Sequence, residues 1–228
     1  MSIQENIARI QAKIEAARAK SPHPDLPVTL VAVSKFHSVD EIREAQAAGA
    51  RVFGENRIQE LLPKLDALED EQVPFHVIGH LQTNKVRQIV GRVAMIQSLD
   101  SERLAQEIEK RAAAKDVTVS VLVQVNMAGE EQKYGMPPEE VKAFLERFAD
   151  FPHLRCEGLM FIAPNLEDKN ELRPYFRGLY EMFKEYQALE IPNVSMTHLS
   201  MGMSGDYDVA IEEGATMVRI GSAIFGKK

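Results

Sequence analysis

The segment Thr29-Leu-Val-Ala-Val-Ser-Lys35 is an apolar stretch of β-type residues that ends in an amine. Lysine is rarely withdrawn from water without a partner. An amine in an apolar site loses its proton more easily and becomes a nucleophile toward aldehydes. The alternative is a lysine at a strand end that extends its ammonium group to solvent. This segment alone leaves both interpretations open.

Apolar segments of the same kind recur along the chain and alternate with segments of helical periodicity. Strands are predicted at residues 30–35, 51–54, 75–79, 94–98, 118–126, 155–162, 194–200 and 216–221. Helices are predicted near 40–48, 57–68, 83–91, 101–114, 137–149, 169–188 and 206–213, and an extra amphipathic helix over 3–19 precedes the first strand. Ser38 and Ser101 are suited to begin two of these helices as N-caps.

Eight strands separated by helices predict an α/β fold in which the sheet closes on itself. Parallel strands joined by helices need helices packed on the sheet, and eight such units close into a (β/α)8 barrel. An open doubly wound sheet is the alternative, but it usually has about five or six strands. No linker or low-complexity segment divides the chain. We therefore expect a single (β/α)8 TIM barrel domain over residues 1–228, with an extra N-terminal helix.

The composition is typical of a globular cytoplasmic protein. Apolar residues make up 45% of the 228 residues, which is ample for a large core. The net charge is −7 with acids and bases interspersed, so a nucleic-acid surface, which needs clustered basic residues, is not expected. The single cysteine, Cys156, excludes an internal disulfide and fits a reducing compartment. Neither a secretory signal nor an apolar run of membrane-spanning length is recognisable, and we expect a cytoplasmic location.

The predicted site lies at the carboxyl ends of the strands, where barrels of this kind place their active-site loops. Polar residues gather at these ends in the sequence, whereas the opposite ends are less distinctive. The candidate residues, in chain order, are Lys35, Asn56, His80, Ser200, Arg219, Gly221 and Ser222. This asymmetry predicts one polar site at one end of an otherwise apolar barrel.

Two glycine-containing segments have the features of a phosphate site. Ser200-Met-Gly-Met-Ser-Gly-Asp206 joins a strand to a helix through a turn whose backbone amides can face an anion. In Arg219-Ile-Gly-Ser-Ala-Ile-Phe-Gly226, Gly221 and Ser222 are placed to open a short helix after the last strand. Barrel enzymes commonly bind phosphate with the loops after strands seven and eight. Ordinary turns that need glycine for a positive φ are the alternative for each segment taken alone.

A nucleophilic lysine and a phosphate site at one barrel end predict a phosphorylated aldehyde as the ligand, and pyridoxal 5′-phosphate (PLP) is such a molecule. The lysine would form a Schiff base with it, and a polar or charged residue would meet the pyridine nitrogen. Arg219 is the candidate for that contact, and because a guanidinium stays charged it would leave the nitrogen unprotonated. The alternative is a salt bridge of Arg219 with Glu55 or Glu157 inside the barrel, since buried charges need partners.

Five longer motifs extend over most of the chain. They are Val31-Ala-Val-Ser-Lys35, Phe53-Gly-Glu-Asn-Arg57, His76-Val-Ile-Gly-His-Leu-Gln82, His198-Leu-Ser-Met-Gly-Met-Ser204 and Val218-Arg-Ile-Gly-Ser-Ala-Ile-Phe-Gly226. Together they resemble the pyridoxal phosphate homeostasis protein family, which is related to the barrel domain of alanine racemase. The resemblance implies a barrel that carries PLP on Lys35, with Arg219 at the ring nitrogen. It also implies phosphate contacts from Ser200, Gly221 and Ser222, and positions near the cofactor for Asn56 and His80.

The resemblance further implies a protein that holds PLP and supplies it to apo-enzymes, with little or no catalysis. Alanine racemases resemble this chain only over the barrel and add a β-rich domain whose tyrosine is the second catalytic base. Proton transfer on both faces of an α-carbon needs a group on each face, and only Lys35 is evident here. A PLP-dependent racemase or related α-carbon enzyme, and an aldolase that uses Lys35 without cofactor, are the alternatives. We expect a monomer without nucleic-acid or membrane partners.

Two other groups of residues are less informative. The six histidines include no zinc-binding run and one cysteine cannot build a thiolate site, so no metal is predicted. Lys133 follows the fifth strand and would lie at the same barrel end. It is either a second lysine that receives or releases the aldehyde or an exposed loop lysine.

Overall fold

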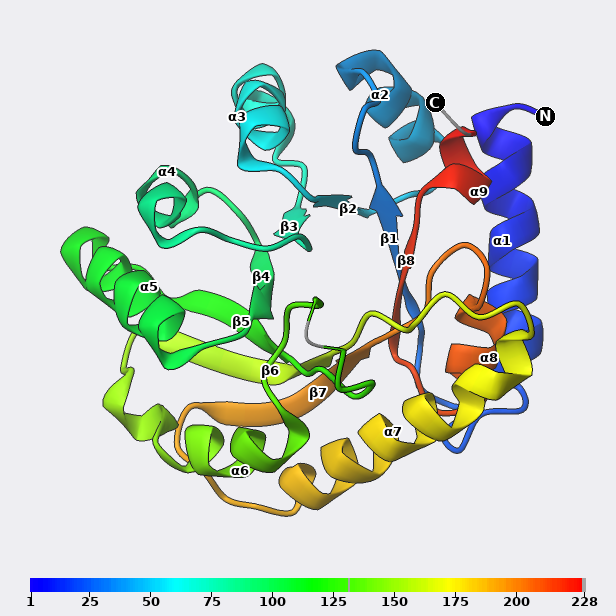
Figure 1. The fold of residues 1–228 in the computed structure, drawn as a ribbon. Helices are drawn as coiled ribbons and strands as arrows, with labels where there is room; N and C mark the ends of the chain where they lie inside the picture. Colours follow the sequence, from blue (N-terminus) through cyan, green and yellow to red (C-terminus); the bar gives the residue numbers. More distant parts are fainter. Residues whose placement is uncertain (131, 227–228) are drawn as a thin grey trace.

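The computed structural model describes residues 1–130 and 132–226 and shows a closed barrel of parallel strands in chain order (Figure 1). The strands are β1 (Thr29–Val33), β2 (Val52–Glu55), β3 (Phe75–Val77), β4 (Met95–Leu99), β5 (Val119–Gln124), β6 (Leu154–Met160), β7 (Val194–Ser200) and β8 (Met217–Ile220). β1 pairs with both β2 and β8, which closes the sheet. The predicted (β/α)8 barrel is confirmed.

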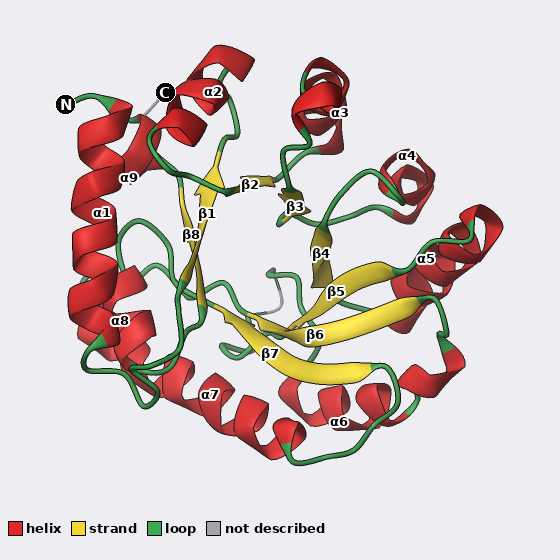
Figure 2. Ribbon diagram, turned by 180° about the vertical axis from the view of Figure 1, so that it is seen from behind, coloured by secondary structure: helices red, strands yellow, loops and turns green. Residues whose placement is uncertain are grey.

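Helices surround the barrel and cover the outer face of the sheet (Figure 2). The α-helices are α1 (Ile3–Arg18), α2 (Val39–Ala47), α3 (Ile58–Ala67), α4 (Val86–Ile89), α5 (Glu102–Lys115), α6 (Pro138–Glu146), α7 (Arg173–Gln187), α8 (Tyr207–Glu212) and α9 (Ser222–Phe225). Short 3-10 helices are η1 (Glu69–Glu71), η2 (Thr83–Lys85), η3 (Phe148–Asp150) and η4 (Lys169–Leu172). Because helices cover one face and the barrel interior covers the other, every residue of β4 and β8 is buried.

The extra N-terminal helix is also confirmed. α1 lies on the outside of the barrel beside α8 and α9 (Figure 1). Ser2 and Glu5 form a capping box at its start. The predicted N-caps Ser38 and Ser101 are present as well, since each side chain accepts a backbone amide of the first turn of its helix.

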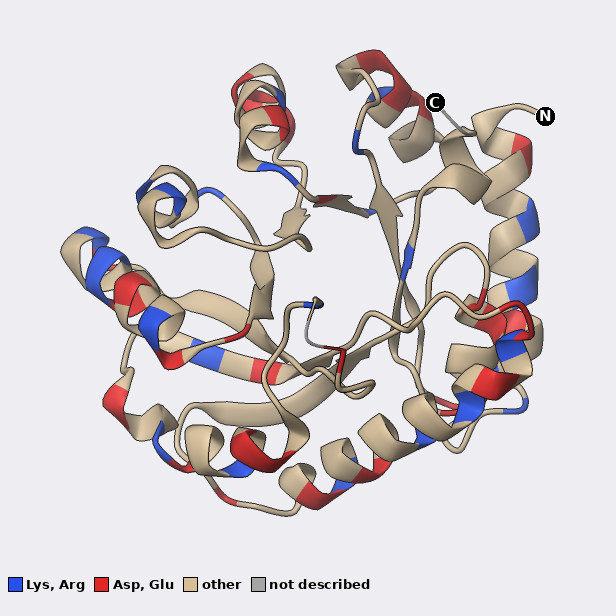
Figure 3. Ribbon diagram, in the orientation of Figure 1, with Lys and Arg blue, Asp and Glu red and all other residues tan. Residues whose placement is uncertain are grey.

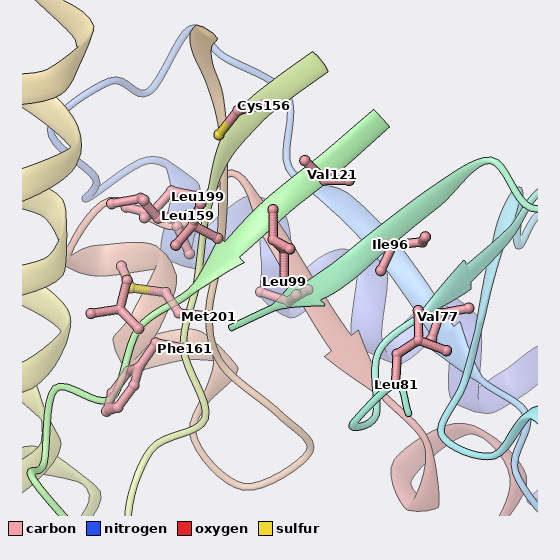
Figure 4. Packing of buried hydrophobic residues seen from close by; sticks show 14 of the residues in the cluster. Val77, Leu81, Ile96, Leu99, Val121, Cys156, Leu159, Phe161, Leu199 and Met201 are labelled. Atoms are coloured by element: carbon pink, nitrogen blue, oxygen red, sulfur yellow. The ribbon is translucent and has the colours of Figure 1, made fainter. Parts of the chain in front are cut away.

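Apolar side chains fill two regions. The larger one lies between the strands and the helices, and Figure 4 shows part of it, including Ile96 and Val121 of neighbouring strands. Met95, Leu122 and Met160 form a separate, smaller cluster. Successive strand residues point to opposite faces, so Met95 lies on the face of β4 opposite Ile96, inside the barrel. The barrel interior thus has an apolar layer of its own.

Charged residues belong mainly to the helices around the outside of the barrel (Figure 3). Among the Asp, Glu, Lys and Arg residues that the structure describes, those that are buried are Glu55, Lys64, Asp206, Glu213 and Arg219. Buried charges are costly unless they are paired or functional, so these residues are informative about the site. No described helix is long and apolar enough to cross a membrane.

The first strand ends two residues before the position that the sequence predicts. After Val33, residues Ser34 to His37 form a turn in which the His37 amide donates to the Ser34 carbonyl oxygen at 3.0 Å. Phe36 has a φ of 66°, in the left-handed region, where a strand cannot continue. Lys35 therefore lies in a turn at the barrel mouth, which we define as the end formed by the carboxyl ends of the strands.

Candidate cofactor site

Lys35 reaches the barrel mouth but is not buried. The residue is exposed, and its Nζ atom lies 5.9 Å from the centre of the Phe36 ring. Of the two interpretations that the sequence left open, the structure favours a lysine that extends its ammonium group to solvent. The reason is the early end of β1 at Val33, because the turn that follows carries the lysine outward.

Both neighbours of Lys35 are fixed by side chains of α3. The Lys64 Nζ atom donates to the Ser34 carbonyl oxygen at 2.8 Å. The Phe36 amide donates to Glu60 Oε2 at 2.9 Å. The peptide groups before and after Lys35 are thus held to one helix, which limits where the amine can point.

Lys64 also belongs to a buried ion pair. Its Nζ atom lies 2.5 Å from Glu55 Oε1, and the Ser34 hydroxyl donates to the same oxygen at 2.7 Å. Glu55 is 1% exposed and Lys64 is 7% exposed. Burial raises the pKa of the Glu55 carboxyl above its ordinary value, and the hydrogen bonds from Lys64 and Ser34 oppose that shift. Sequence reasoning did not identify Lys64, because a lysine on an amphipathic helix is normally exposed.

Arg219 of β8 is buried inside the barrel, at 3% exposed. Its Nη1 atom donates to Ser200 Oγ at 2.7 Å, and its Nη2 atom donates to the Phe161 carbonyl oxygen at 2.8 Å. Burial lowers the pKa of Arg219 to about 10, and the nearby Asp206 carboxylate opposes that shift. The guanidinium therefore remains charged at neutral pH.

The alternative role of Arg219, a salt bridge inside the barrel, is not observed. Glu55 pairs with Lys64, and Glu157 accepts the Ser120 hydroxyl at 2.7 Å. Within residues 1–130 and 132–226, the hydrogen-bond acceptors of Arg219 are a hydroxyl and a backbone carbonyl, without a carboxylate. A buried cation without a bonded anion retains the capacity to bind a further acceptor.

The Ser200 hydroxyl continues a chain of hydrogen bonds across the barrel. It donates to Gln97 Oε1 at 2.7 Å, and Gln97 Nε2 lies 2.8 Å from His76 Nδ1. Because a guanidinium only donates, these bonds are all satisfied when each donor points away from Arg219 toward His76. The His76 Nδ1 atom is then an acceptor and unprotonated, which agrees with burial lowering the pKa of His76 to about 4. We call these four residues the interior chain.

The interior chain changes the role expected of Ser200. The sequence predicted a phosphate contact, whereas the fully buried hydroxyl bonds Arg219 and Gln97. These contacts favour a role in holding the guanidinium. Gln97 was missed, although a polar residue two positions after Met95 in an apolar strand was a signal that it faces the barrel interior.

The two predicted phosphate segments meet at the mouth. Ser204 Oγ accepts the Gly221 amide at 3.3 Å and the Ala223 amide at 3.4 Å, so the loops after β7 and β8 face each other. Ser222 is the first residue of α9, and its amide has no partner within that helix. A Cβ atom at Gly221 would lie 3.1 Å from the Val33 carbonyl oxygen. Backbone amides that converge on one oxygen are suited to the oxygens of an anion.

The turn that carries Ser204 depends on a glycine and an aspartate. Gly202 has a φ of 94°, and a Cβ atom there would lie 2.7 Å from Ala210 Cβ. Asp206 Oδ1 accepts the Met203 amide at 2.5 Å. These constraints keep Ser204 at the mouth. The sequence alone did not single out Ser204 as a phosphate-loop residue, because it lies in the same glycine-containing segment as Ser200.

Asn56 and His80 follow β2 and β3 and line one pocket at the mouth. The Asn56 Oδ1 atom is buried and has no hydrogen-bond partner among the described residues. His80 is exposed; its Nδ1 atom lies 3.3 Å from Asp100 Oδ2, and its ring stacks on Tyr134 with 3.8 Å between the ring centres. Asn56 therefore has free hydrogen-bonding capacity, whereas protein groups already contact His80.

Lys133 lies in the loop after β5. Its Nζ atom is 2.9 Å from Glu130 Oε1 and 3.4 Å from the Ala163 carbonyl oxygen. This amine has to leave both acceptors before it can react with an aldehyde. The contacts favour the interpretation of Lys133 as a loop lysine.

The site residues fit PLP better than they fit a metal ion. Val31 of β1 pairs with Arg219 of β8. Lys35 follows Val31 by four residues and therefore lies closer to the mouth than Arg219. An amine above a cation, together with backbone amides at the mouth, suits an aldehyde with a ring nitrogen and a phosphate. Within the described part of the chain, no group of three or more His, Cys, Asp or Glu residues could hold a metal ion.

Comparisons with known proteins agree with this chemistry. The family model described as alanine racemase, N-terminal domain, matches residues 6–228. The pyridoxal phosphate homeostasis protein of Aquifex aeolicus is 44% identical over 228 residues, which is 100% of this chain and 99% of that protein. The structure of PipY from Synechococcus elongatus PCC7942 with PLP bound has a TM-score of 0.85 at 35% identity, covering 99% of this chain and 100% of that chain.

An alanine racemase from Corynebacterium glutamicum shares the fold alone. Its TM-score is 0.69 at 16% identity, and the match covers 99% of this chain and 61% of the racemase. The full-length relatives and the family model, in contrast, confirm the resemblance seen in the sequence motifs. The chain belongs to the pyridoxal phosphate homeostasis protein family, whose barrel corresponds to the N-terminal domain of alanine racemase.

Proposed function

We propose that this chain binds PLP at the barrel mouth as a Schiff base on Lys35 and supplies it to apo-enzymes. When bound, PLP supplies an aldehyde that reacts with primary amines. Arg219 would donate to the pyridine nitrogen, and Ser200 would act through Arg219. The residues that would contact PLP are Lys35, Asn56, His80, Ser204, Arg219, Gly221 and Ser222.

The observation that carries this proposal is the buried guanidinium of Arg219. A charge withdrawn from water needs acceptors, and a guanidinium has five N–H donors. Two of its nitrogens already donate to Ser200 and to a backbone carbonyl. An aromatic nitrogen above it would be a further acceptor. A pyridine nitrogen that accepts from a charged guanidinium stays unprotonated, which makes the ring a weaker electron sink.

The named properties of the relatives support the same cofactor. The PipY structure holds PLP, and the Aquifex aeolicus relative is named for PLP homeostasis. The motif residues Lys35 and Arg219 lie in segments that these full-length matches span. The proposal therefore rests on the geometry of this chain and on similarity over its whole length.

We further propose that residues 1–228 act as one monomeric, cytoplasmic cofactor-binding domain with apo PLP-dependent enzymes as transient partners. One large hydrophobic cluster draws on most of the strands and helices around the barrel, which supports a single domain. Cys156 is a free, buried thiol, as expected in a reducing compartment. The exposure of Lys35 supports supply, because a recipient amine can approach it from solvent.

An absorbance spectrum before and after borohydride treatment tests cofactor binding. Protein incubated with PLP is expected to show a visible band that disappears on reduction, and a spectrum equal to that of free PLP would contradict the proposal. Supply is tested separately by activation of an apo-enzyme. Transfer faster than spontaneous release into solution would support supply, and transfer at the release rate would contradict it.

Ser200→Ala is expected to weaken PLP binding about tenfold to a hundredfold without removing the Schiff base. Arg219 loses an acceptor and is no longer held toward the ring nitrogen, so its proposed charge-assisted hydrogen bond to that nitrogen, worth about 1.5–3 kcal/mol, is weakened. A PLP titration measures the change in Kd. Ser204→Ala is the comparison at the phosphate loops, and an unchanged Kd for Ser200→Ala would remove Ser200 from the site.

The holo-protein is not expected to racemise amino acids at enzyme-like rates. Lys35 can exchange an α-proton on one face only, and racemisation needs a group on each face. Incubation with L-alanine in deuterated water measures the reaction. Appearance of deuterated D-alanine at about 1 s⁻¹ or faster, the lower end of typical turnover numbers, would instead support the racemase alternative.

A further inference from the structure

A pocket beside the proposed PLP site shares Asn56 and His80 with it, but its other lining residues have no role in the binding described so far. It lies at the barrel mouth between the segments that follow β2 and β3 and has a volume of about 730 Å³. Small-molecule sites have volumes of about 300–1,000 Å³. Its lining residues are Asn56, Arg57, Ile58, Gln59, Glu60, Gly79, His80, Gln82, Lys85 and Tyr134. Asn56 and His80 are also candidate cofactor residues, so the pocket opens onto the cofactor site.

The pocket has an excess of positive charge. Arg57 and Lys85 are its cations, and Lys85 forms no ion pair with any residue that the structure describes. Glu60 is the one acid in the lining, but one of its oxygens accepts the Phe36 amide and the other lies 3.6 Å from Arg57. A cation without a partner at the wall of a cavity favours an anionic ligand.

The start of α3 adds to this preference. Arg57 is the N-cap of this helix and makes no side-chain capping bond. The first backbone amides of the helix therefore lack a side-chain acceptor from the cap, and the helix dipole is positive at this end. Arg57, Ile58 and Gln59 all line the pocket, so these amides lie at its wall beside the two cations.

A hydrogen-bond acceptor lies next to the cations. The Asn56 Oδ1 atom is buried in the same wall and has no partner among the described residues. A buried acceptor without a donor costs free energy, so a ligand with an N–H group is favoured here. An α-amino acid is a small molecule that carries both an anionic group and an N–H donor.

The pocket lies on the same side of the mouth as Lys35. The Arg57 guanidinium carbon is 5.6 Å from the centre of the Phe36 ring, and Lys35 Nζ is 5.9 Å from the same centre. Both side chains therefore lie beside Phe36, so a ligand whose carboxylate binds Arg57 lies in the part of the mouth that carries Lys35. The stacked rings of His80 and Tyr134 form an aromatic wall for the remainder of the ligand.

We propose that this pocket binds free α-amino acids, with the carboxylate at Arg57 and Lys85 and the amine at Asn56. The inference deepens the proposed function, on which it rests, because it names the amine that approaches Lys35. The pocket selects amines that carry a carboxylate over simple amines. Arg57 and Lys85 are thus specificity-determining residues, separate from those that hold PLP.

Ligand titrations of the cofactor-free protein, followed by NMR of the Asn56 side-chain amide, test the inference. L-Alanine is expected to bind at least about tenfold more tightly than ethylamine or acetate, since each of those lacks one of the two groups. Inorganic phosphate is the fourth probe. Equal affinities for L-alanine and ethylamine, or tighter binding of phosphate than of L-alanine, would overturn the proposal.

Substitutions locate the carboxylate. Lys85→Gln and Arg57→Gln are each expected to weaken L-alanine binding about tenfold and to leave ethylamine binding unchanged. Arg51→Gln is the matched control. It removes the same charge from a position just before β2, at the opposite end of the barrel. An equal loss of L-alanine affinity in Arg51→Gln and Lys85→Gln would show that the effect comes from net charge. That result would contradict a binding site at Lys85.

The PLP spectrum separates this inference from the proposed function. A normal borohydride-sensitive band in protein that fails to bind L-alanine would refute the pocket alone. Absence of the band would refute cofactor binding, whatever the result of the L-alanine titration. Lys85→Gln is expected to keep the band, because Lys85 is not among the residues proposed to contact PLP.

Discussion

Lys35→Ala abolishes the borohydride-stable adduct with PLP and leaves the barrel folded; this is the expected result of the most direct test of the site. Without the amine no Schiff base forms, and only the contacts of Arg219 and the phosphate loops remain. The side chain is exposed, and surface substitutions usually change stability by less than about 0.5 kcal/mol. Intact-mass spectrometry after reduction measures the adduct, and thermal unfolding measures the fold.

Lys133→Ala is the matched control for this experiment. Lys133 is also a lysine in a loop at the mouth, but its amine is held by Glu130 and the Ala163 carbonyl oxygen. The adduct is expected to persist in this variant at the wild-type level. Peptide mapping that located the adduct on Lys133 or another lysine in the wild-type protein, with none on Lys35, would contradict the assignment.

The fold was predictable because its signals are local. Alternating apolar and helical periodicities placed all eight strands and the N-terminal helix, and serines at helix starts placed their caps. The one consequential boundary error was at Lys35. A turn in which Phe36 takes a positive φ has no sequence signal, because such residues rarely adopt that conformation and only tertiary contacts stabilise it here.

The candidate site was predictable in its residue types but not in its partners. Lys35 and Arg219 are recognisable because each interrupts or follows an apolar strand. The hydrogen bond from Ser200 to Gln97 was not predictable, since these residues come from β7 and β4, which are not neighbours in the barrel. Which interior side chains meet across a barrel depends on its stagger and on packing, which one sequence does not reveal.

Two separate sets of contacts hold the residues of the proposed PLP site in place. The interior chain holds the Arg219 guanidinium from inside the barrel. The side chains of α3 hold the turn around Lys35 from the outside, through Lys64 and Glu60. The covalent and the ring-nitrogen contacts thus depend on different parts of the fold, and substitutions in one part should leave the other intact.

Lys64→Met is expected to destabilise the protein by about 3–5 kcal/mol at neutral pH, the largest stability effect that we predict. The substitution leaves the Glu55 carboxylate buried without its cation, and breaking a buried ion pair on one side has a cost of this size. The Ser34 carbonyl oxygen loses its donor as well, so the turn around Lys35 is loosened. Urea unfolding measures the change in free energy.

The dependence of this loss on pH identifies its cause. Burial already raises the pKa of Glu55 from its ordinary value of 4.5, and removal of Lys64 raises it further, since Lys64 opposes that shift. A group whose folded-state pKa is raised favours folding below its unfolded-state pKa and loses that contribution as the pH rises through the folded-state value. The deficit of Lys64→Met should accordingly be small near pH 4.5 and grow toward neutral pH.

Two further variants complete the test of the buried pair. Lys64→Met combined with Glu55→Gln removes both charges and is expected to recover most of the stability at neutral pH, since no carboxylate is left without a cation. Lys110→Met, on the exposed face of α5, is the matched control and should change the unfolding free energy by less than about 0.5 kcal/mol. An effect of Lys64→Met no larger than that of Lys110→Met, or no recovery in the double variant, would show that the ion pair does not stabilise this end of the barrel.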